Sequence, residues 1–197
     1  MEGAEQAAGS RQQQSRLQCA EACSALYIER GTTDLTIAEI AASVGVSERT
    51  FYRYFPIKAE SVSPIFDWTT AAFNAAVAAA PPEASARDAL LAAFRAGISG
   101  AKLARSRALF PLVFADEQMW SVFLRKVHDG ERTLAPVLAP RLHEPADSIA
   151  SRIAAAAVAS ATRIALENMV VDGDDPESRF IELLDGFGAG VFPPHPA

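Results

Sequence analysis

The stretch TIAEIAASVGVSERTFYRYF, residues 36–55, decides the fold of this protein. Thr36 is followed three positions later by Glu39, which is the pattern of a capping box at the start of a helix. Gly45 can adopt the left-handed conformation that ends this helix, and Ser47 can cap the next one. Two short helices joined by a glycine turn are typical of a helix-turn-helix.

The second of these helices has two different faces. At about 100° per residue, Phe51 and Phe55 fall together on one side, whereas Arg49 and Arg53 fall on the other. The aromatic pair predicts a packed face and the arginine pair a displayed face. Guanidinium groups four residues apart on such a helix suit the DNA major groove, where they can pair with guanine or hold phosphates.

Positive charge is concentrated in this segment, although the whole chain has a formal net charge of -6 and a pI near 5.1. Over residues 46–58, Arg49, Arg53 and Lys58 outnumber Glu48. The overall acidity argues against a protein that coats nucleic acid by charge alone, but it allows a local site. Glu48 has two interpretations: it can accept a hydrogen bond from cytosine, or it can simply stabilise the helix N-terminus.

The residues before the helix-turn-helix predict a tail and one further helix. Residues 1–15 are polar, with a glutamine run, and predict a disordered tail, and a helix follows from Arg16 to Arg30. The only cysteines, Cys19 and Cys23, lie four apart in this helix, so we expect them to pack inside. They are too few for a disulfide framework and lack the partners of a zinc site, which favours a reduced, cytoplasmic compartment.

Residues 36–61, TIAEIAASVGVSERTFYRYFPIKAES, closely resemble the DNA-binding domain of TetR-family transcriptional repressors. The YIERG of residues 27–31 matches the end of the first helix in that family, and the resemblance covers residues 16–62. Ile57 departs from the pattern, because a small polar residue usually caps the following helix there. The resemblance implies that the third helix enters the major groove. It carries over Glu48, Arg49, Thr50 and Arg53 as candidate base-edge residues, and Thr36, Ser47, Tyr52, Tyr54 and Lys58 as candidate phosphate contacts.

The rest of the chain shows no strand pattern, so we expect an all-α fold. We predict helices over about residues 58–80, 84–103, 109–114, 117–142 with interruptions at Pro136 and Pro140, 146–171 and 179–187. The predicted organisation is a tail over residues 1–15, a three-helix helix-turn-helix DNA-binding domain over residues 16–62, and a helical-bundle ligand-binding and dimerisation domain over residues 63–197.

The last two helices are candidates for a subunit interface. The run IAAAAVASAT, residues 153–162, presents small residues on all sides, and a helix that is apolar all round must be buried. The resemblance implies a four-helix bundle between two subunits. Such a homodimer would present two recognition helices to a palindromic operator in double-stranded DNA, with half-sites about one DNA turn, ~34 Å, apart.

Large side chains between these regions could line a pocket for a small effector. Any one of them is more often ordinary core, but together they are compatible with an apolar or elongated ligand. Arg163 has two interpretations: it holds an anionic group of the ligand, or it pairs with Glu167 or is simply exposed. The alanine-rich pattern of residues 101–171 also resembles family members that sense fatty acyl thioesters. The candidate ligand-binding residues are Trp68, Phe73, Phe94, Phe110, Phe114, Met119, Trp120, Phe123 and Arg163.

Enzymatic chemistry finds no support in the sequence. His128, His143 and His195 show no metal-ligand spacing, and the GFGAG of residues 186–190 follows a predicted helix rather than a strand. We therefore expect neither a catalytic site nor a metal or cofactor.

Targeting and membrane signals are also missing from the sequence. The N-terminal residues contain no apolar segment, and arginines flank the alanine-rich run, so we expect no export and no membrane span. The sequence predicts a cytoplasmic, ligand-responsive repressor that a small, apolar effector releases from its operator. The alternative is a helical small-molecule-binding or interaction protein without operator function.

Overall fold

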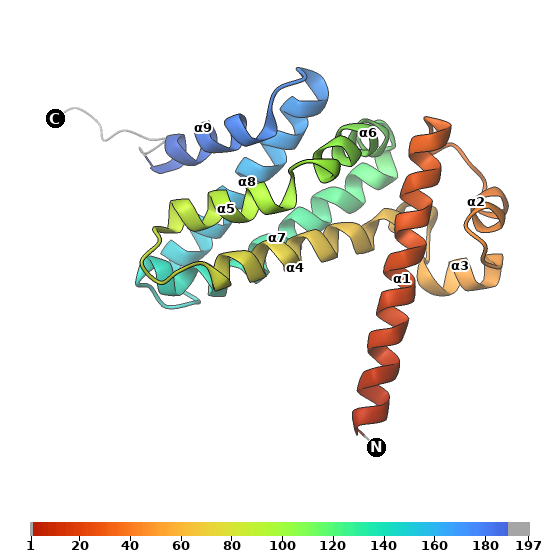
Figure 1. Ribbon diagram of the computed structural model, residues 1–197, viewed down its shortest axis with the longest axis horizontal. Helices are drawn as coiled ribbons and strands as arrows, with labels where there is room; N and C mark the ends of the chain where they lie inside the picture. The colour runs from red at the N-terminus through yellow and green to blue at the C-terminus, as the bar shows by residue number, and fades with distance from the viewer. Residues whose placement is uncertain (1, 189–197) are drawn as a thin grey trace. The chain divides into compact units, whose positions relative to one another are not determined.

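The computed structural model describes residues 2–188 of the 197-residue chain. Over this range the protein consists of helices without a strand, which confirms the predicted all-α class (Figure 1). The helices are α1 (Glu2–Arg30), α2 (Ile37–Ser43), α3 (Glu48–Tyr54), the 3-10 helix η1 (Lys58–Val62), α4 (Ser63–Ala79), α5 (Ala86–Gly97), α6 (Ala101–Ala115), α7 (Glu117–Leu142), α8 (Ile149–Val171) and α9 (Pro176–Gly188).

The described residues form two compact units. The first contains the residues up to Trp68 together with Ala108–Lys126, and the second contains Thr69–Arg107 and the residues from Val127 onward. The first unit therefore combines the helix-turn-helix segment with part of α6 and the start of α7. The predicted domain boundary at residue 62 stays a prediction.

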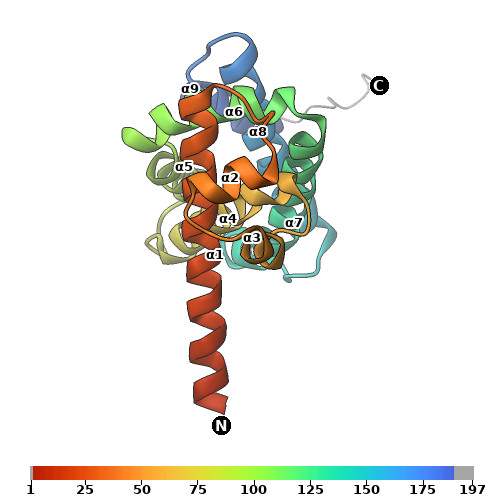
Figure 2. The same cartoon turned by 90° about the vertical axis from the view of Figure 1, so that its right-hand side faces the viewer.

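Helix α1 is longer than the sequence pattern suggested. It begins at Glu2, so residues 2–15 of the expected disordered tail are helical in the structure, and residue 1 lies outside the described range. Alanine, glutamate and glutamine dominate this segment and are strong helix formers, and they extend a helix whose later turns are packed. Both views show the N-terminal part of α1 projecting beyond α3 (Figures 1 and 2).

The inner face of α1 forms part of the core of the first unit. Cys19 and Cys23 are free and buried there, as predicted. Hydrogen bonding to Cys19 and burial raise the pKa of the Cys23 thiol far above its ordinary value. One turn further on, the fully buried Tyr27 hydroxyl lies 2.9 Å from the Ser61 hydroxyl of η1. This polar contact joins α1 to the segment that follows the helix-turn-helix.

In the second unit, α9 packs against both α8 and α5. Phe94 of α5 stacks on Phe180 of α9 with ring centroids 4.1 Å apart. Ion pairs lie at the edge of this contact, with Arg87 Nε 2.6 Å from Asp185 and Arg95 Nε 2.6 Å from Glu177. The two stacked rings are buried, whereas both ion pairs are partly exposed and add little to stability.

Three predicted helix boundaries were wrong. The helix expected over residues 109–114 begins at Ala101 and ends at Ala115. The helix expected over residues 84–103 ends at Gly97, and a turn with Gly100 at a φ of +55° separates it from α6. Conversely, α7 continues through Pro136 and Pro140 without interruption. Proline removes a backbone donor but does not forbid a helix where buried neighbours hold it, and Leu138 is 1% exposed.

Helix α8 is long and apolar enough to span a membrane by length and composition, but only 33% of its most apolar window is buried in this chain. The core helix of a protein that never enters a membrane meets the same criterion. Ile149, Ile153 and Val171 are exposed apolar positions of this helix.

Candidate nucleic-acid interface

The helix-turn-helix begins with the predicted capping box. The Thr36 hydroxyl accepts a hydrogen bond from Glu39 N at 3.2 Å, and Thr36 N donates to the Glu39 carboxylate at 2.8 Å. The hydroxyl and N–H of Thr36, which both donate to this carboxylate, lower the pKa of Glu39 below its ordinary value. The Thr36 hydroxyl, which was predicted to contact phosphate, therefore also caps α2.

The turn between α2 and α3 has the predicted construction. Gly45 adopts a φ of +74°, in the left-handed region. Ser47 then caps α3, because its Oγ accepts from Thr50 N at 3.1 Å and donates to Thr50 Oγ1 at 3.0 Å. Glu48 occupies the first turn of α3 and is exposed, so its carboxylate lies where the helix dipole favours negative charge.

The two faces of α3 are separated as the periodicity predicted. Phe51 and Phe55 are fully buried, and their ring centroids lie 5.1 Å apart in an edge-to-face contact. Arg49 and Arg53 are exposed, and the guanidinium carbon of Arg53 lies 5.2 Å from the centroid of the Tyr54 ring. The buried pair holds α3 in place while the arginines face solvent.

The tyrosines of α3 differ in exposure. Tyr52 is 52% exposed, which leaves its ring and hydroxyl available to a partner. Tyr54 is half-buried, and its carbonyl accepts a hydrogen bond from Arg16 Nε at 3.1 Å. The Arg16 guanidinium carbon also lies 5.9 Å from the centroid of the Phe55 ring. These two contacts of Arg16 connect α1 to the C-terminal end of α3.

Lys58 is oriented by a contact that the sequence did not reveal. Its ammonium donates to the Thr33 carbonyl at 2.9 Å, and the Thr33 hydroxyl donates to Asp116 Oδ2 at 3.0 Å. The other oxygen of Asp116 accepts from Met119 N at 3.0 Å, at the start of α7. As its departure from the family pattern suggested, Ile57 precedes Lys58 without capping η1, and it is 49% exposed.

The large apolar side chains that are candidates for ligand binding fall into two groups, one in each unit. In the first unit, Trp68 is 51% exposed and Met119 is fully buried. A connected set of ring contacts also lies in this unit and includes Phe66, which the sequence analysis did not single out. In the second unit, Phe94 stacks on Phe180, and Phe73 packs against the apolar core. The connected set consists of Phe66, Phe110, Phe114, Trp120 and Phe123.

Arg163 lies on α8 and is engaged within the chain. Its Nη1 lies 2.5 Å and 2.7 Å from the two carboxylate oxygens of Glu167, one helical turn further on. The structure thus shows the ion-pair interpretation, and the two side chains remain about one-third exposed.

The capped turn, the buried aromatic pair and the exposed arginines of α3 together define a helix-turn-helix of the kind found in DNA-binding proteins. The comparison with known families specifies it further. Residues 21–60 match the family described as "Bacterial regulatory proteins, tetR family". A curated relative, the nucleoid occlusion factor SlmA of Pasteurella multocida (strain Pm70), is 48% identical over 42 residues. That alignment spans 21% of this chain and 21% of the relative.

Solved structures extend the likeness to the whole fold. A TetR-family transcriptional regulator from Rhodococcus sp., described as putative, superposes with a TM-score of 0.56 at 15% identity, covering 91% of this chain and 98% of that one. Thermus thermophilus FadR, a TetR-family repressor in complex with lauroyl-CoA, superposes with a TM-score of 0.62 at 19% identity, covering 92% and 99%. The chain thus carries the N-terminal domain of the TetR family and has the fold of its regulators.

Proposed function

We propose that this protein is a transcriptional repressor that binds a palindromic operator as a homodimer and is released by a small, apolar effector. One observation carries the DNA-binding part: α3 displays Arg49 and Arg53 opposite the buried Phe51 and Phe55. A capped, rigid helix with two exposed guanidinium groups can enter a major groove and contact base edges and phosphates. The match of residues 21–60 to the TetR family supports the same reading.

The dimer is supported by apolar side chains at the surface of the second unit. On α8, Ile149, Ile153 and Val171 are 74%, 63% and 78% exposed, and Phe187 of α9 is 37% exposed. Exposed apolar side chains on neighbouring helices favour association with another protein surface. In a dimer with two-fold symmetry through α8 and α9, each subunit would contribute one recognition helix. The operator would then need the same two-fold symmetry.

The effector is proposed to be apolar, with a fatty acyl thioester as the first compound to test. The aromatic side chains of the connected set pack on one another in the first unit and would supply the apolar lining, and FadR, whose fold this chain shares, is described in complex with lauroyl-CoA. The effector would act through a higher affinity for the conformation that does not fit the operator. The protein is proposed to act in the cytoplasm and to have no enzymatic activity.

Selection from random duplex DNA with the purified protein tests the DNA-binding proposal. We expect an enriched palindrome whose half-sites lie about one helical turn apart. Arg49→Ala should cost about 1–3 kcal/mol of binding free energy and relax the preference at one base pair in each half-site. Arg132→Ala, which removes an exposed arginine from α7, serves as the control and should leave binding unchanged. Without an enriched palindrome the proposal fails, and a helical binding protein without an operator is the better description.

Mass spectrometry of small molecules that copurify with the protein tests the effector. We expect a compound with a long apolar chain, and lauroyl-CoA should weaken binding to the enriched duplex. If only polar compounds copurify and acyl thioesters leave DNA binding unchanged, the apolar effector is excluded.

A further inference from the structure

The candidate phosphate contact Lys58 is held by residues from two distant parts of the sequence. Its ammonium donates a hydrogen bond to the Thr33 carbonyl at 2.9 Å, and the Thr33 hydroxyl donates to Asp116 Oδ2 at 3.0 Å. Thr33 lies in the turn between α1 and α2, and Asp116 lies between α6 and α7. All three residues are half-buried and belong to the first unit.

The Thr33 carbonyl is a fixed acceptor for the Lys58 ammonium. It accepts a second hydrogen bond from Leu35 N at 2.8 Å, within the turn that leads into α2. The hydroxyl of the same residue is bound to Asp116. Because both the carbonyl and the hydroxyl of Thr33 are engaged, this residue cannot turn away from Lys58 without breaking one of these bonds.

Asp116 is itself fixed at the start of α7. Its Oδ1 accepts hydrogen bonds from Gln118 N and Met119 N, each at 3.0 Å, and Met119 is fully buried. An aspartate that accepts from backbone N–H groups in the first turn of a helix is an N-cap, and this role fixes the orientation of its carboxylate. The second oxygen then receives the Thr33 hydroxyl, so a 26-residue helix supports the contact.

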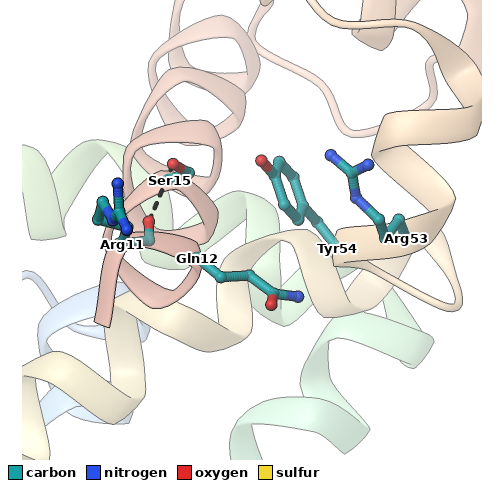
Figure 3. A pocket seen from close by; sticks show the side chains of 5 residues that line it. All are labelled: Arg11, Gln12, Ser15, Arg53 and Tyr54. Atoms are coloured by element: carbon teal, nitrogen blue, oxygen red, sulfur yellow. Dashed lines mark hydrogen bonds between the residues drawn. The ribbon is translucent and has the colours of Figure 1, made fainter. Parts of the chain in front are cut away.

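An ordered lysine side chain is an advantage in binding phosphate. A lysine loses much rotamer entropy when its ammonium is fixed on a ligand, and order that exists before binding reduces this cost. The ammonium has three N–H donors, so the bond to Thr33 leaves donors for phosphate oxygens. Arg53 is oriented differently, because its guanidinium lies beside the ring of Tyr54, its neighbour on α3 (Figure 3).

We propose that Thr33 and Asp116 are positioning residues for DNA binding, which hold the Lys58 ammonium where it meets a backbone phosphate of the duplex. This inference rests on the proposed DNA-binding function. Within it, Asp116 acts from outside residues 21–60, the segment that matches the TetR family. A phosphate contact fixes the position of the protein on DNA without reading sequence. Loss of the Thr33–Asp116 hydrogen bond should therefore weaken the binding of every duplex by the same factor.

Thr33→Val tests this proposal, because valine has nearly the shape of threonine but lacks the hydroxyl that donates to Asp116. The ligands are the selected palindrome and a scrambled duplex of equal length. We expect Thr33→Val to bind both about two- to tenfold more weakly per subunit, with an unchanged slope of log K against log salt because every charge is kept. Lys58→Ala should also weaken binding, but it should reduce this slope by about 0.9 per subunit. In the Lys58→Ala background, Thr33→Val should have no further effect, because Thr33 acts through Lys58.

Two control variants separate this contact from the turn around it. Thr33→Ser keeps the hydroxyl and should bind DNA like the wild type. Thr32→Val removes a hydroxyl of the same turn, which accepts from Asp34 N at 3.0 Å, and should leave DNA binding unchanged. An equal loss of affinity in Thr32→Val would show that the turn as a whole matters, and would reject the specific role of Asp116.

Other outcomes would overturn the proposal in distinguishable ways. Additive losses in the double variant of Thr33 and Lys58 would show that Thr33 does not act through Lys58. Wild-type affinity in Thr33→Val, with wild-type protein binding the palindrome, would reject the positioning role and leave the proposed function intact. If wild-type protein binds neither duplex, the proposed function itself fails.

Discussion

The buried contact between Tyr27 and Ser61 makes a quantitative prediction about the first unit. Both residues are fully buried, and their hydroxyls lie 2.9 Å apart. Tyr27→Phe leaves the Ser61 hydroxyl buried without this partner, which should cost about 1–3 kcal/mol of unfolding free energy. Ser61→Ala strands the Tyr27 hydroxyl with a similar cost. The double variant removes both groups, so it should be less destabilised than the sum of the single variants by about 0.5–1.5 kcal/mol.

Urea unfolding followed by tryptophan fluorescence measures the free energy of unfolding of the first unit. Trp68 and Trp120 are the two tryptophans of the chain, and both lie in this unit. With an m-value of about 2 kcal/mol/M, a loss of about 2 kcal/mol lowers the midpoint by about 1 M. Tyr52→Phe removes an exposed hydroxyl and should change stability by less than about 0.5 kcal/mol. Strictly additive single effects would refute a direct Tyr27–Ser61 interaction.

Three further predictions concern the turn, the recognition helix and the second unit. Gly45→Ala should destabilise the protein by about 1–2 kcal/mol because Gly45 has a φ of +74°. Gly97→Ala is the control and should not destabilise it, because Gly97 has a normal φ and an added Cβ would meet no atom within 4 Å at either position. Equal effects of the two substitutions in chemical denaturation would contradict the backbone argument. Phe51→Ala should cost about 3–5 kcal/mol and abolish DNA binding through loss of the folded helix; a variant with wild-type thermal stability would show that this ring is not core. Hydrogen bonding and ion pairing with Arg87 lower the pKa of Asp185. The stability that this carboxylate adds, relative to Asp185→Asn, should therefore be present above about pH 4 and disappear as the pH falls through the lowered folded-state pKa. A stability difference between the two proteins that grows in acid, measured in thermal scans, would contradict this sign.

The construction of α3 and of the turn before it was predictable because its determinants are local. Capping by Thr36 and Ser47, the glycine turn and the opposite placement of Phe51 and Arg49 follow from spacing within a few residues. The helix boundaries were less predictable: Gly97 ends α5, whereas Pro136 and Pro140 do not end α7. In these cases tertiary packing decides whether a residue that disfavours helix stops one.

The sequence pattern did not predict contacts between residues that are distant in sequence. Thr33, which orients Lys58 and bonds to Asp116, looks like any turn residue, and the aromatic set that includes Phe66 joins three helices. Helical periodicity indicates which side of a helix is buried, but it carries no information about which other helix covers that side.

By itself, the sequence determined that this protein is all-helical, that it contains a capped helix-turn-helix, and that α3 packs through phenylalanines while displaying arginines. These properties depend on backbone conformation and periodicity over one or two helical turns. Only the tertiary structure decided that α1 continues to Glu2 and that its Arg16 hydrogen-bonds to the Tyr54 carbonyl of α3. This hydrogen bond joins residues 38 positions apart in sequence, and no local pattern predicts such a contact.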